Sequence, residues 1–400
     1  MTALLHTTAR IAAADNFQIL HGFGLPGDGA EPWGSLALSG TTLYGMTLKG
    51  GDNDLGTIFK YDLASSTYAR LYSFTGSATD GASPLGGLTI DGSTLYGTAE
   101  LGGDSNHGVA FRFDLSAQSL SVMHSFGHIY PGPTDGIYPT SNLLKVGNLL
   151  YGTTEVGSSA YGVIYAINPA DNSENVVYSF YSELGGVRPS GSPIQIGSKL
   201  YLTTELGAGN SNAGTVTSFD PISGQAATLH AFGAPGDGVH PCGNLLQSGH
   251  LLYGLTTQGG ASNLGSIYSV DLNDNSEKVL FSFNNWLVDG SLPYGSLAQI
   301  GSVLYGMTAA GGSVNAGVIF SFDTATDTYS IVRDFQFSDG SVPEYTQLLA
   351  VGDTLYGMTA GAGPNGHGEM FALTVPEPTT LCAMSVGLLP LVARRKRSSD

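Results

Sequence analysis

Cysteine and basic residues are both scarce in this sequence. Cys242 and Cys382 are the only cysteines among 400 residues, so the chain has no disulfide framework, and neither is spaced for metal binding. Lys and Arg number 14 against 32 Asp and Glu, and four of the basic residues lie within the last seven positions. The remaining body is strongly acidic and would repel nucleic acid and anionic lipid. Cations or neutral sugars are the expected partners, unless the acidic surface serves only to keep an exported protein soluble.

Charged residues as a whole make up only 12% of the chain, which is too few for long solvent-facing helices. Gly, Tyr and Phe are abundant instead, at 58, 20 and 17 residues, and this composition favours β structure. Catalytic motifs such as Gly-x-Ser-x-Gly, His-Glu-x-x-His and Cys-x-x-Cys do not occur. Residues 361–366 match a dinucleotide-binding fingerprint in letters alone, because no predicted helix follows to supply backbone N–H groups. We therefore expect no enzyme active site and no cofactor.

One unit of about 52 residues occurs seven times between residues 17 and 375. Its first mark is a motif of the form Leu-Tyr-Gly-x-Thr, in which Leu202 replaces the Gly of the fourth copy. The Tyr of the motif stands at Tyr44, Tyr96, Tyr151, Tyr201, Tyr253, Tyr305 and Tyr356. A glycine then opens the next strand, at Gly56, Gly108, Gly162, Gly214, Gly265, Gly317 and Gly368. A phenylalanine closes the unit, at Phe23, Phe74, Phe126, Phe180, Phe232, Phe283 and Phe335.

Each unit is predicted to form four short strands. In the first full copy they cover residues 35–38, 42–47, 56–62 and 68–74, where apolar and polar side chains alternate between Gly-rich turns. We name these strands A to D. The intervals that vary in length fall in the D–A and B–C loops, as surface loops allow. Seven such units predict an all-β fold, a seven-bladed β-propeller of four-stranded blades.

The two ends of the repeat region complement each other. Residues 17–23 resemble a lone strand D, and residues 368–375 resemble a strand C with no strand D after it. An N-terminal strand is therefore predicted to complete the last blade, which removes both open sheet edges. The chain then divides into an N-terminal segment (1–16), the propeller (17–375) and a tail (376–400).

The repeat resembles two known families. Gly-Gly followed by Phe-x-Tyr-Asp is similar to the kelch propeller repeat, although the later tryptophan of kelch is absent. The fuller pattern, from Leu-Tyr-Gly through Gly-Gly to Gly-x-Ile-Phe-x-Phe-Asp, resembles the GloVer (Gloeobacter/Verrucomicrobia) tandem repeat over residues 17–375. That resemblance implies a repeat architecture and no established biochemical activity.

The tail resembles a PEP-CTERM sorting signal. A Pro-Glu-Pro motif is followed by an apolar segment at 381–393 and a basic end; the residues that carry the resemblance are Pro376, Glu377, Pro378, Arg394, Arg395, Lys396 and Arg397. The resemblance implies an exosortase-type sorting enzyme as partner, export, and residence in the cell envelope or extracellular matrix. The apolar segment is only 13 residues long, so we expect transient membrane insertion and leave open whether the tail is cleaved or stays as an anchor.

The N-terminal segment fits export less well. Residues 1–15 have no basic start, and their apolar stretch is broken by His6 and Arg10. We interpret 1–16 as the remnant of an export signal, with retention in the cytoplasm as the alternative.

The D–A loops contain the candidate binding face. Six of them carry an Asp before a Gly and a following Pro: Asp28, Asp80, Asp135, Asp237, Asp289 and Asp339. The structural interpretation is an Asp-Gly turn in which Gly supplies a positive φ and Asp caps the loop. The functional interpretation is a ring of carboxylates at the channel mouth that binds Ca²⁺ or a sugar. Exposed aromatic residues in the same loops suit sugar stacking, namely Trp33, His128, Tyr130 and Trp286.

Other polar repeat positions are expected to be structural. His21, His124 and His230 alternate with aromatic residues at one position of strand D, which marks a packing position. Asn residues of the B–C turns are predicted to be left-handed turn residues, at Asn106, Asn212, Asn263 and Asn315. We therefore expect a monomeric, non-enzymatic surface or matrix protein, a scaffold or a module that binds exopolysaccharide or other surface components. The alternative is a propeller-type polysaccharide hydrolase or lyase.

Overall fold

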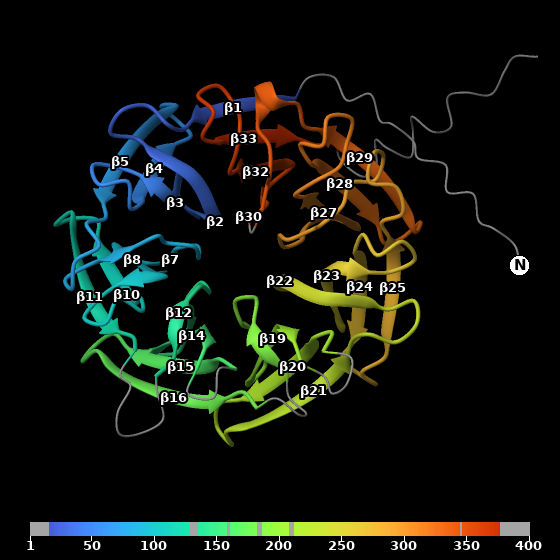
Figure 1. Ribbon diagram of the computed structural model, residues 1–400, viewed down its shortest axis with the longest axis horizontal. Helices are drawn as coiled ribbons and strands as arrows, with labels where there is room; N and C mark the ends of the chain where they lie inside the picture. Colours follow the sequence, from blue (N-terminus) through green and yellow to red (C-terminus); the bar gives the residue numbers. More distant parts are fainter. Residues whose placement is uncertain are drawn as a thin grey trace, which may run out of the picture.

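The computed structural model describes residues 16–127, 135–157, 161–181, 186–207, 212–344 and 346–376. Seven small antiparallel sheets stand around a central opening and follow one another in chain order (Figure 1). The protein is all-β and has the seven-bladed propeller arrangement that the repeats predict. Among the described residues the only helix is the short η2 (Phe337–Asp339), and none is long and apolar enough to span a membrane.

The strands of blades one to six run from the channel to the rim (Figure 1). Blade one contains β2 (Gly29–Ser39), β3 (Thr42–Gly50), β4 (Thr57–Asp62) and β5 (Thr67–Ser73). Blade two contains β7 (Thr89–Asp91), β8 (Thr94–Ala99), β10 (Val109–Asp114) and β11 (Ser119–Ser125), with the ladder of β6 (Gly81–Ala82) and β9 (Leu101–Gly102). Blade three contains β12 (Ile137–Pro139), β13 (Leu144–Val146), β14 (Leu149–Val156), β15 (Val163–Asn168) and β16 (Ser173–Ser179).

The second half of the ring repeats this order. Blade four contains β17 (Val187–Pro189), β18 (Ile194–Ile196), β19 (Lys199–Leu206), β20 (Thr215–Asp220) and β21 (Gln225–Ala231). Blade five contains β22 (Gly238–Ser248), β23 (Leu251–Gly259), β24 (Ser266–Asp271) and β25 (Glu277–Ser282). Blade six contains β26 (Ala298–Ile300), β27 (Val303–Thr308), β28 (Val318–Asp323) and β29 (Thr328–Asp334).

Blade seven is completed by the N-terminal strand. Its own strands are β31 (Leu349–Val351), β32 (Thr354–Thr359) and β33 (Glu369–Thr374), and β1 (Phe17–Gly22) pairs antiparallel with β33. The short β30 (Thr346–Gln347), which precedes β31, pairs in parallel with β2 of blade one. The Phe23 N–H donates to Gly368 O at 3.0 Å, which extends the ladder by one residue. The predicted closure is therefore present in the structure, because β1 covers the edge of β33 that would otherwise be unpaired.

The innermost strand differs from the prediction. Strand A was expected at 35–38, whereas β2 begins at Gly29, because the D–A loop residues pair with the end of β3, Gly29 opposite Gly50. A bulge between Trp33 and Ala37 separates the two halves of this pairing. The same early segment forms β12 and β17 in blades three and four. The segment contains Gly and Pro, which are rare within strands, so the sequence pattern did not predict this pairing.

A glycine and an aromatic ring face each other on strands B and C. A Cβ at Gly45 would lie 2.5 Å from the Phe59 ring, and Gly45 pairs directly with Phe59. The fourth copy inverts this arrangement, because Leu202 replaces the glycine and its partner on β20 is Thr217. Both residues are buried, so a larger side chain on strand B is matched by a smaller one on strand C. The exception in the repeat motif is thus a compensated exchange.

Neighbouring blades are joined by the residue that precedes the loop proline. In all seven copies this residue has a left-handed conformation, with φ between 52° and 59°. Its N–H donates to a carbonyl of the preceding blade; the donors are Glu31, Ser83, Tyr138, Arg188, His240, Leu292 and Val342. The proline that follows packs against the glycine that opens strand C of the preceding blade, as Pro84 does on Gly56. The Gly and Pro repeat marks therefore form the blade junctions.

Apolar side chains fill the space between blades. The seven closing phenylalanines are at most 2% exposed. Phe74 of blade one, for example, shares a buried cluster with Leu95 and Phe111 of blade two. Cys242 is also buried, its Sγ donates to Pro293 O at 3.0 Å, and burial raises the pKa of the thiol. This cysteine is a packing residue.

Candidate binding site at the channel mouth

The six loop aspartates are buried and point into their own loops. Asp237, for example, accepts hydrogen bonds from the N–H groups of Gly233 and Gly238 at 3.1 and 2.7 Å. Asp80 likewise accepts from the N–H groups of Thr75 and Ser77. The full set, buried in this way, is Asp28, Asp80, Asp135, Asp237, Asp289 and Asp339. None of the six lines the central cavity, and the structural interpretation of a capped turn accounts for their position.

The glycine after the aspartate has the predicted role in three of the six loops. Gly136, Gly290 and Gly340 have a positive φ, but Gly29, Gly81 and Gly238 do not. A Cβ at Gly29 would lie 2.4 Å from the Thr47 side chain, so the glycine is needed for close approach to strand B. The expectation that every such Gly supplies a positive φ is wrong for these three copies.

Each histidine of strand D is bonded to the aspartate of the loop that follows it. The Nε2–Oδ2 distances are 2.8 Å for His21–Asp28, 2.7 Å for His124–Asp135 and 3.0 Å for His230–Asp237. Each ring also packs edge-on against the closing Phe two residues later. The packing role predicted for the histidines is present. The pairing with aspartate was not predicted, because it requires the loop to turn back on its own strand.

The B–C turn asparagines take the predicted conformation. Asn106, Asn212, Asn263 and Asn315 have φ between 48° and 60°, and each Oδ1 accepts a hydrogen bond from a glycine N–H of the same turn. They are turn residues.

The predicted aromatic residues separate into different places. Trp33 is half-buried and lines the central cavity, whereas Trp286 is 47% exposed and does not line it. His128 and Tyr130 lie outside the described residues, as does the tail from Glu377 onward. Of the predicted binding face, therefore, Trp33 is the residue that the structure places at a cavity.

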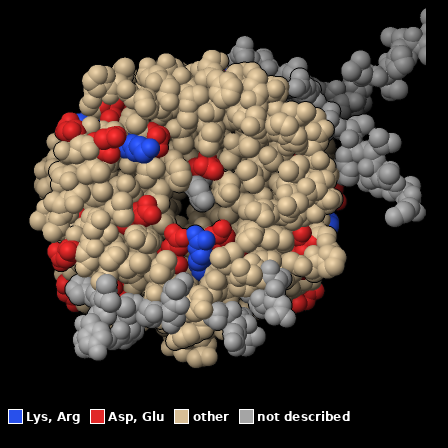
Figure 2. Space-filling view, viewed as in Figure 1, with Lys and Arg blue, Asp and Glu red and all other residues tan. Residues whose placement is uncertain are grey.

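The central cavity has a volume of about 260 Å³ and a charged rim. Arg188 forms ion pairs with both Glu155 and Glu205, and the Arg188 Nη1–Glu205 Oε2 distance is 3.5 Å. Figure 2 shows acidic and basic side chains gathered beside the central opening. Trp33 and Tyr294 add aromatic surface to the lining.

The cavity floor is built from inner-strand polar groups that bond across the channel. Asn142 Nδ2 donates to Ser35 Oγ at 2.9 Å, which joins blade three to blade one. Asn244 Nδ2 donates to Gln347 Oε1 at 3.2 Å, which joins blade five to blade seven. Ser192 N–H donates to Asn244 Oδ1 at 2.7 Å. The first two contacts join blades that are not neighbours and the third joins the neighbouring blades four and five, and together they place fixed hydroxyl and amide groups around the cavity.

The rim glutamates Glu155 and Glu205 occupy one position of the repeat that the sequence reasoning overlooked, and Glu100, which is not part of the cavity lining, occupies the same position in blade two. Glu100, Glu155 and Glu205 each stand four residues after the motif tyrosine in blades two, three and four. The other blades carry Leu48, Thr257, Ala309 and Ala360 at this position. Burial raises the pKa of Glu100, and the neighbouring Glu155 carboxylate raises it further. Column-by-column comparison of the seven repeats would have revealed this local break in symmetry.

The arrangement suits a ligand rich in hydroxyl groups. Carboxylates accept hydrogen bonds from hydroxyls, Arg188 and the Asn side chains donate them, and aromatic rings pack against sugar faces. The paired carboxylates are bridged by a guanidinium, so part of their charge is already neutralised.

Solved structures with similar folds include several enzymes. The chain is similar to an oligogalacturonate lyase in complex with manganese, with a TM-score of 0.59, 13% identity, and coverage of 94% of this chain and 97% of that one. A puromycin-hydrolysing peptidase of Mycobacterium tuberculosis gives a TM-score of 0.55 at 12% identity, covering 86% of this chain and 52% of that one. A putative 6-phosphogluconolactonase from Bacteroides uniformis gives 0.51 at 15% identity, covering 80% and 88%. At these identities the likeness shows the propeller fold alone.

Comparison at the level of sequence gives a family but no characterised relative. A search among curated proteins finds no match. The model of the Gloeobacter/Verrucomicrobia repeat matches residues 7–160 and 155–371, which together span most of the chain. This protein therefore belongs to the Gloeobacter/Verrucomicrobia repeat family.

Proposed function

We propose that this protein is a non-enzymatic, exported propeller of the cell surface or matrix that binds a hydroxyl-rich partner, a neutral or cationic glycan, at the channel mouth. The observation that carries the proposal is the cavity beside Trp33, where Arg188 lies between Glu155 and Glu205 above a floor of Ser and Asn side chains. These charged, hydroxyl and amide groups stand beside the aromatic rings of Trp33 and Tyr294, and this combination favours a ligand with both hydroxyl groups and apolar faces, as sugars have.

The alternative function is a polysaccharide hydrolase or lyase that uses Glu100 together with the neighbouring rim glutamate Glu155. Glu100 favours it, because a carboxyl with a raised pKa beside a second carboxylate is the arrangement of a general acid and its partner. Against it, Glu155 and Glu205 are both engaged by Arg188. The structural neighbours named as enzymes lend the alternative only their fold.

Binding is tested with acidic, neutral and cationic oligosaccharides by intrinsic tryptophan fluorescence and calorimetry. A bound neutral or cationic glycan is expected to shift the emission of wild-type protein, and Trp33→Phe should remove most of that shift. Arg188→Gln should weaken binding at least tenfold. Trp286→Phe is the matched control, since Trp286 lies outside the cavity and its replacement should leave affinity unchanged.

Product analysis after incubation with the same oligosaccharides separates the two functions. Release of reducing ends or unsaturated sugars by wild-type protein, abolished in Glu100→Gln, would replace the binding proposal by the enzymatic one. Loss of binding in Trp286→Phe with retention in Trp33→Phe would move the site to the outer loop.

Export rests on the tail, where Arg394–Arg397 follow an apolar segment after the Pro-Glu-Pro motif. A cationic end that stays cytoplasmic orients such a segment in the membrane. Full-length protein in a host with an exosortase-type enzyme is expected in the envelope or the medium. Neutral replacements at the four basic positions should mislocalise the protein, so that its distribution among cell fractions differs from that of the wild type. Identical cytoplasmic fractionation of both versions would contradict export.

A further inference from the structure

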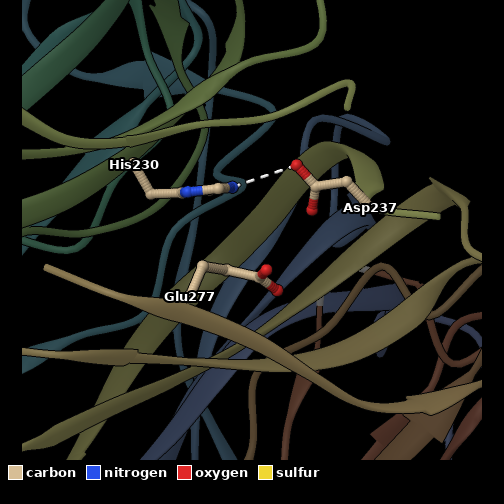
Figure 3. Close-up of side chains that lie close together, drawn as sticks. All are labelled: His230, Asp237 and Glu277. Atoms are coloured by element: carbon tan, nitrogen blue, oxygen red, sulfur yellow. Dashed lines mark hydrogen bonds and ion pairs between the residues drawn. The ribbon is translucent and has the colours of Figure 1, made fainter. Parts of the chain in front are cut away.

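Three potential metal ligands converge at the junction of blades four and five. His230 lies on β21, Asp237 lies in the loop before β22, and Glu277 begins β25 (Figure 3). Their ligand atoms all lie within 4.8 Å of one another. The three side chains come from three separate elements and point toward a common space, which is how protein metal sites are assembled. The cluster is separate from the channel-mouth cavity.

Two of the three side chains are held in place by other contacts. Asp237 is buried: its Oδ2 accepts from the Gly233 N–H and lies 3.0 Å from His230 Nε2, and its Oδ1 accepts from the Gly238 N–H. The His230 ring packs edge-on against Phe232 at a centroid distance of 4.6 Å. Orientation of ligands by neighbouring groups is a feature of metal sites in general.

Glu277 has no structural explanation of this kind. Its Oε1 is buried and accepts no hydrogen bond from any residue that the structure describes. Burial raises the pKa of Glu277 to about 7, and the Asp237 carboxylate adds to the rise while His230 opposes it. A second carboxyl beside Asp237 without a donor is costly in free energy. A cation between the two carboxylates would remove both the repulsion and the unmet hydrogen-bonding capacity.

Comparison of the blade junctions supports a link between the glutamate and the His–Asp pair. At the repeat position of Glu277 the other blades carry Phe17, Tyr68, Leu120, Glu174, Ala226 and Tyr329. The only other glutamate at this position is Glu174 of blade three, and the strand D of the preceding blade carries His124, which is paired with Asp135. At the third His–Asp junction, Tyr68 stacks on His21 at 3.7 Å instead. Glutamate thus occurs at this position only beside a His–Asp pair.

We propose that His230, Asp237 and Glu277 bind a divalent transition-metal ion, Zn²⁺ or Mn²⁺, that ties the rim of blade five to blade four. One imidazole nitrogen and two carboxylate oxygens form a donor set suited to these ions, with the remaining positions open to water. Because metal ligands bind in their deprotonated forms, affinity is expected to rise with pH. Because the ligands join two blades, the bound ion stabilises the folded ring.

The test uses full-length protein stripped with a chelator and then dialysed. Zn²⁺ and Mn²⁺ uptake is measured by calorimetry, and melting temperature is measured with and without each ion. Wild-type protein is expected to bind at least one equivalent of one of these ions and to melt higher when loaded. Glu277→Gln should lose one equivalent and the associated rise in melting temperature, and affinity in the wild type should fall at least tenfold between pH 8 and pH 6.

His21→Phe is the matched control, because that junction has the His–Asp pair without a glutamate. The His21→Phe variant should retain wild-type stoichiometry. His230→Phe introduces the residue that blade five carries at the same repeat position, Phe281, and it should lose the same equivalent as Glu277→Gln. A cooperative thermal unfolding transition of each metal-free variant shows that the variant still folds. No uptake by stripped wild-type protein, equal uptake by Glu277→Gln, or preference for Ca²⁺ over both transition metals would overturn the proposal.

Discussion

Glu369, the first residue of β33, is a carboxyl group enclosed by the fold. It is fully buried, and both carboxyl oxygens lack a hydrogen-bond partner among the described residues. Burial raises its pKa from 4.5 to about 8; Asp339 adds to the rise and Arg333 opposes it. The other blades carry uncharged residues at this position, namely Thr57, Val109, Val163, Thr215, Ser266 and Val318.

This raised pKa predicts a pH-dependent stability. Between about pH 4.5 and pH 8 the folded protein keeps a proton that the unfolded chain releases, so the free energy of unfolding falls as pH rises. The loss amounts to roughly 1.4 kcal/mol for each pH unit of that window. Glu369→Gln should therefore unfold at higher urea concentration than wild type at pH 8, with a much smaller difference at pH 4.5. Parallel pH profiles for the two proteins would show that Glu369 does not titrate in this way.

Tyr268 offers a second test at the level of one atom. Its hydroxyl is buried without a hydrogen-bond partner among the described residues, and four other blades have Phe at this position: Phe59, Phe111, Phe320 and Phe371. Tyr268→Phe should raise the free energy of unfolding by about 1 kcal/mol, since it removes an unsatisfied donor. Tyr72→Phe is the control and should lower it, because the Tyr72 hydroxyl donates to Asp80 at 3.0 Å. Destabilisation by both changes in urea titrations would imply that Tyr268 has a partner.

Among the strands, the exchange of Leu202 and Thr217 makes a clear prediction. Both side chains are buried on paired positions of β19 and β20. Leu202→Gly alone should lower the free energy of unfolding by about 3–5 kcal/mol, because it leaves a cavity. Thr217→Phe alone should lower it by about 1–3 kcal/mol through overpacking. The double variant restores the Gly–Phe pair found in four of the other blades and should recover most of the loss.

A double-mutant cycle from urea unfolding measures this coupling. The two effects are expected to compensate by at least ~1 kcal/mol, as residues in direct contact do. Additive losses in the double variant would mean that the two positions do not share one packing volume.

The sequence predicted the strands better than the contacts between them. The interval from Gly56 to Phe74, which is constant among the repeats, predicts the hairpin of β4 and β5, and the constant interval from Leu36 to Tyr44 predicts the hairpin of β2 and β3, because constant intervals fix hairpin register. The early start of β2 was not predicted, since a Gly- and Pro-containing stretch does not alternate as strands do. The His–Asp pairs and the charged rim depend on loops folding back and on blades meeting, and no local pattern reports either.

For the whole molecule, the ring depends on seven equivalent junctions. Glu31 N–H donates to His367 O at 2.9 Å and Pro32 packs on Gly368, so the first and last blades meet through the same contacts as any other pair. Phe23, fully buried after β1, packs near Phe59 of blade one at a centroid distance of 5.2 Å. The N-terminal strand thus joins blade seven and also contributes to the core beside blade one.

Deletion of residues 16–23 along with all that precedes them should therefore open the ring. The edge of β33 would lose its partner, and Phe59 would lose the Phe23 ring that covers it. We expect a fall in melting temperature of at least ~10 °C, together with concentration-dependent aggregation seen by light scattering. Deletion of residues 1–15 is the matched control, because it keeps β1 intact. If both truncated proteins remain monomeric with equal melting temperatures, the pairing of β1 with β33 does not hold the ring closed.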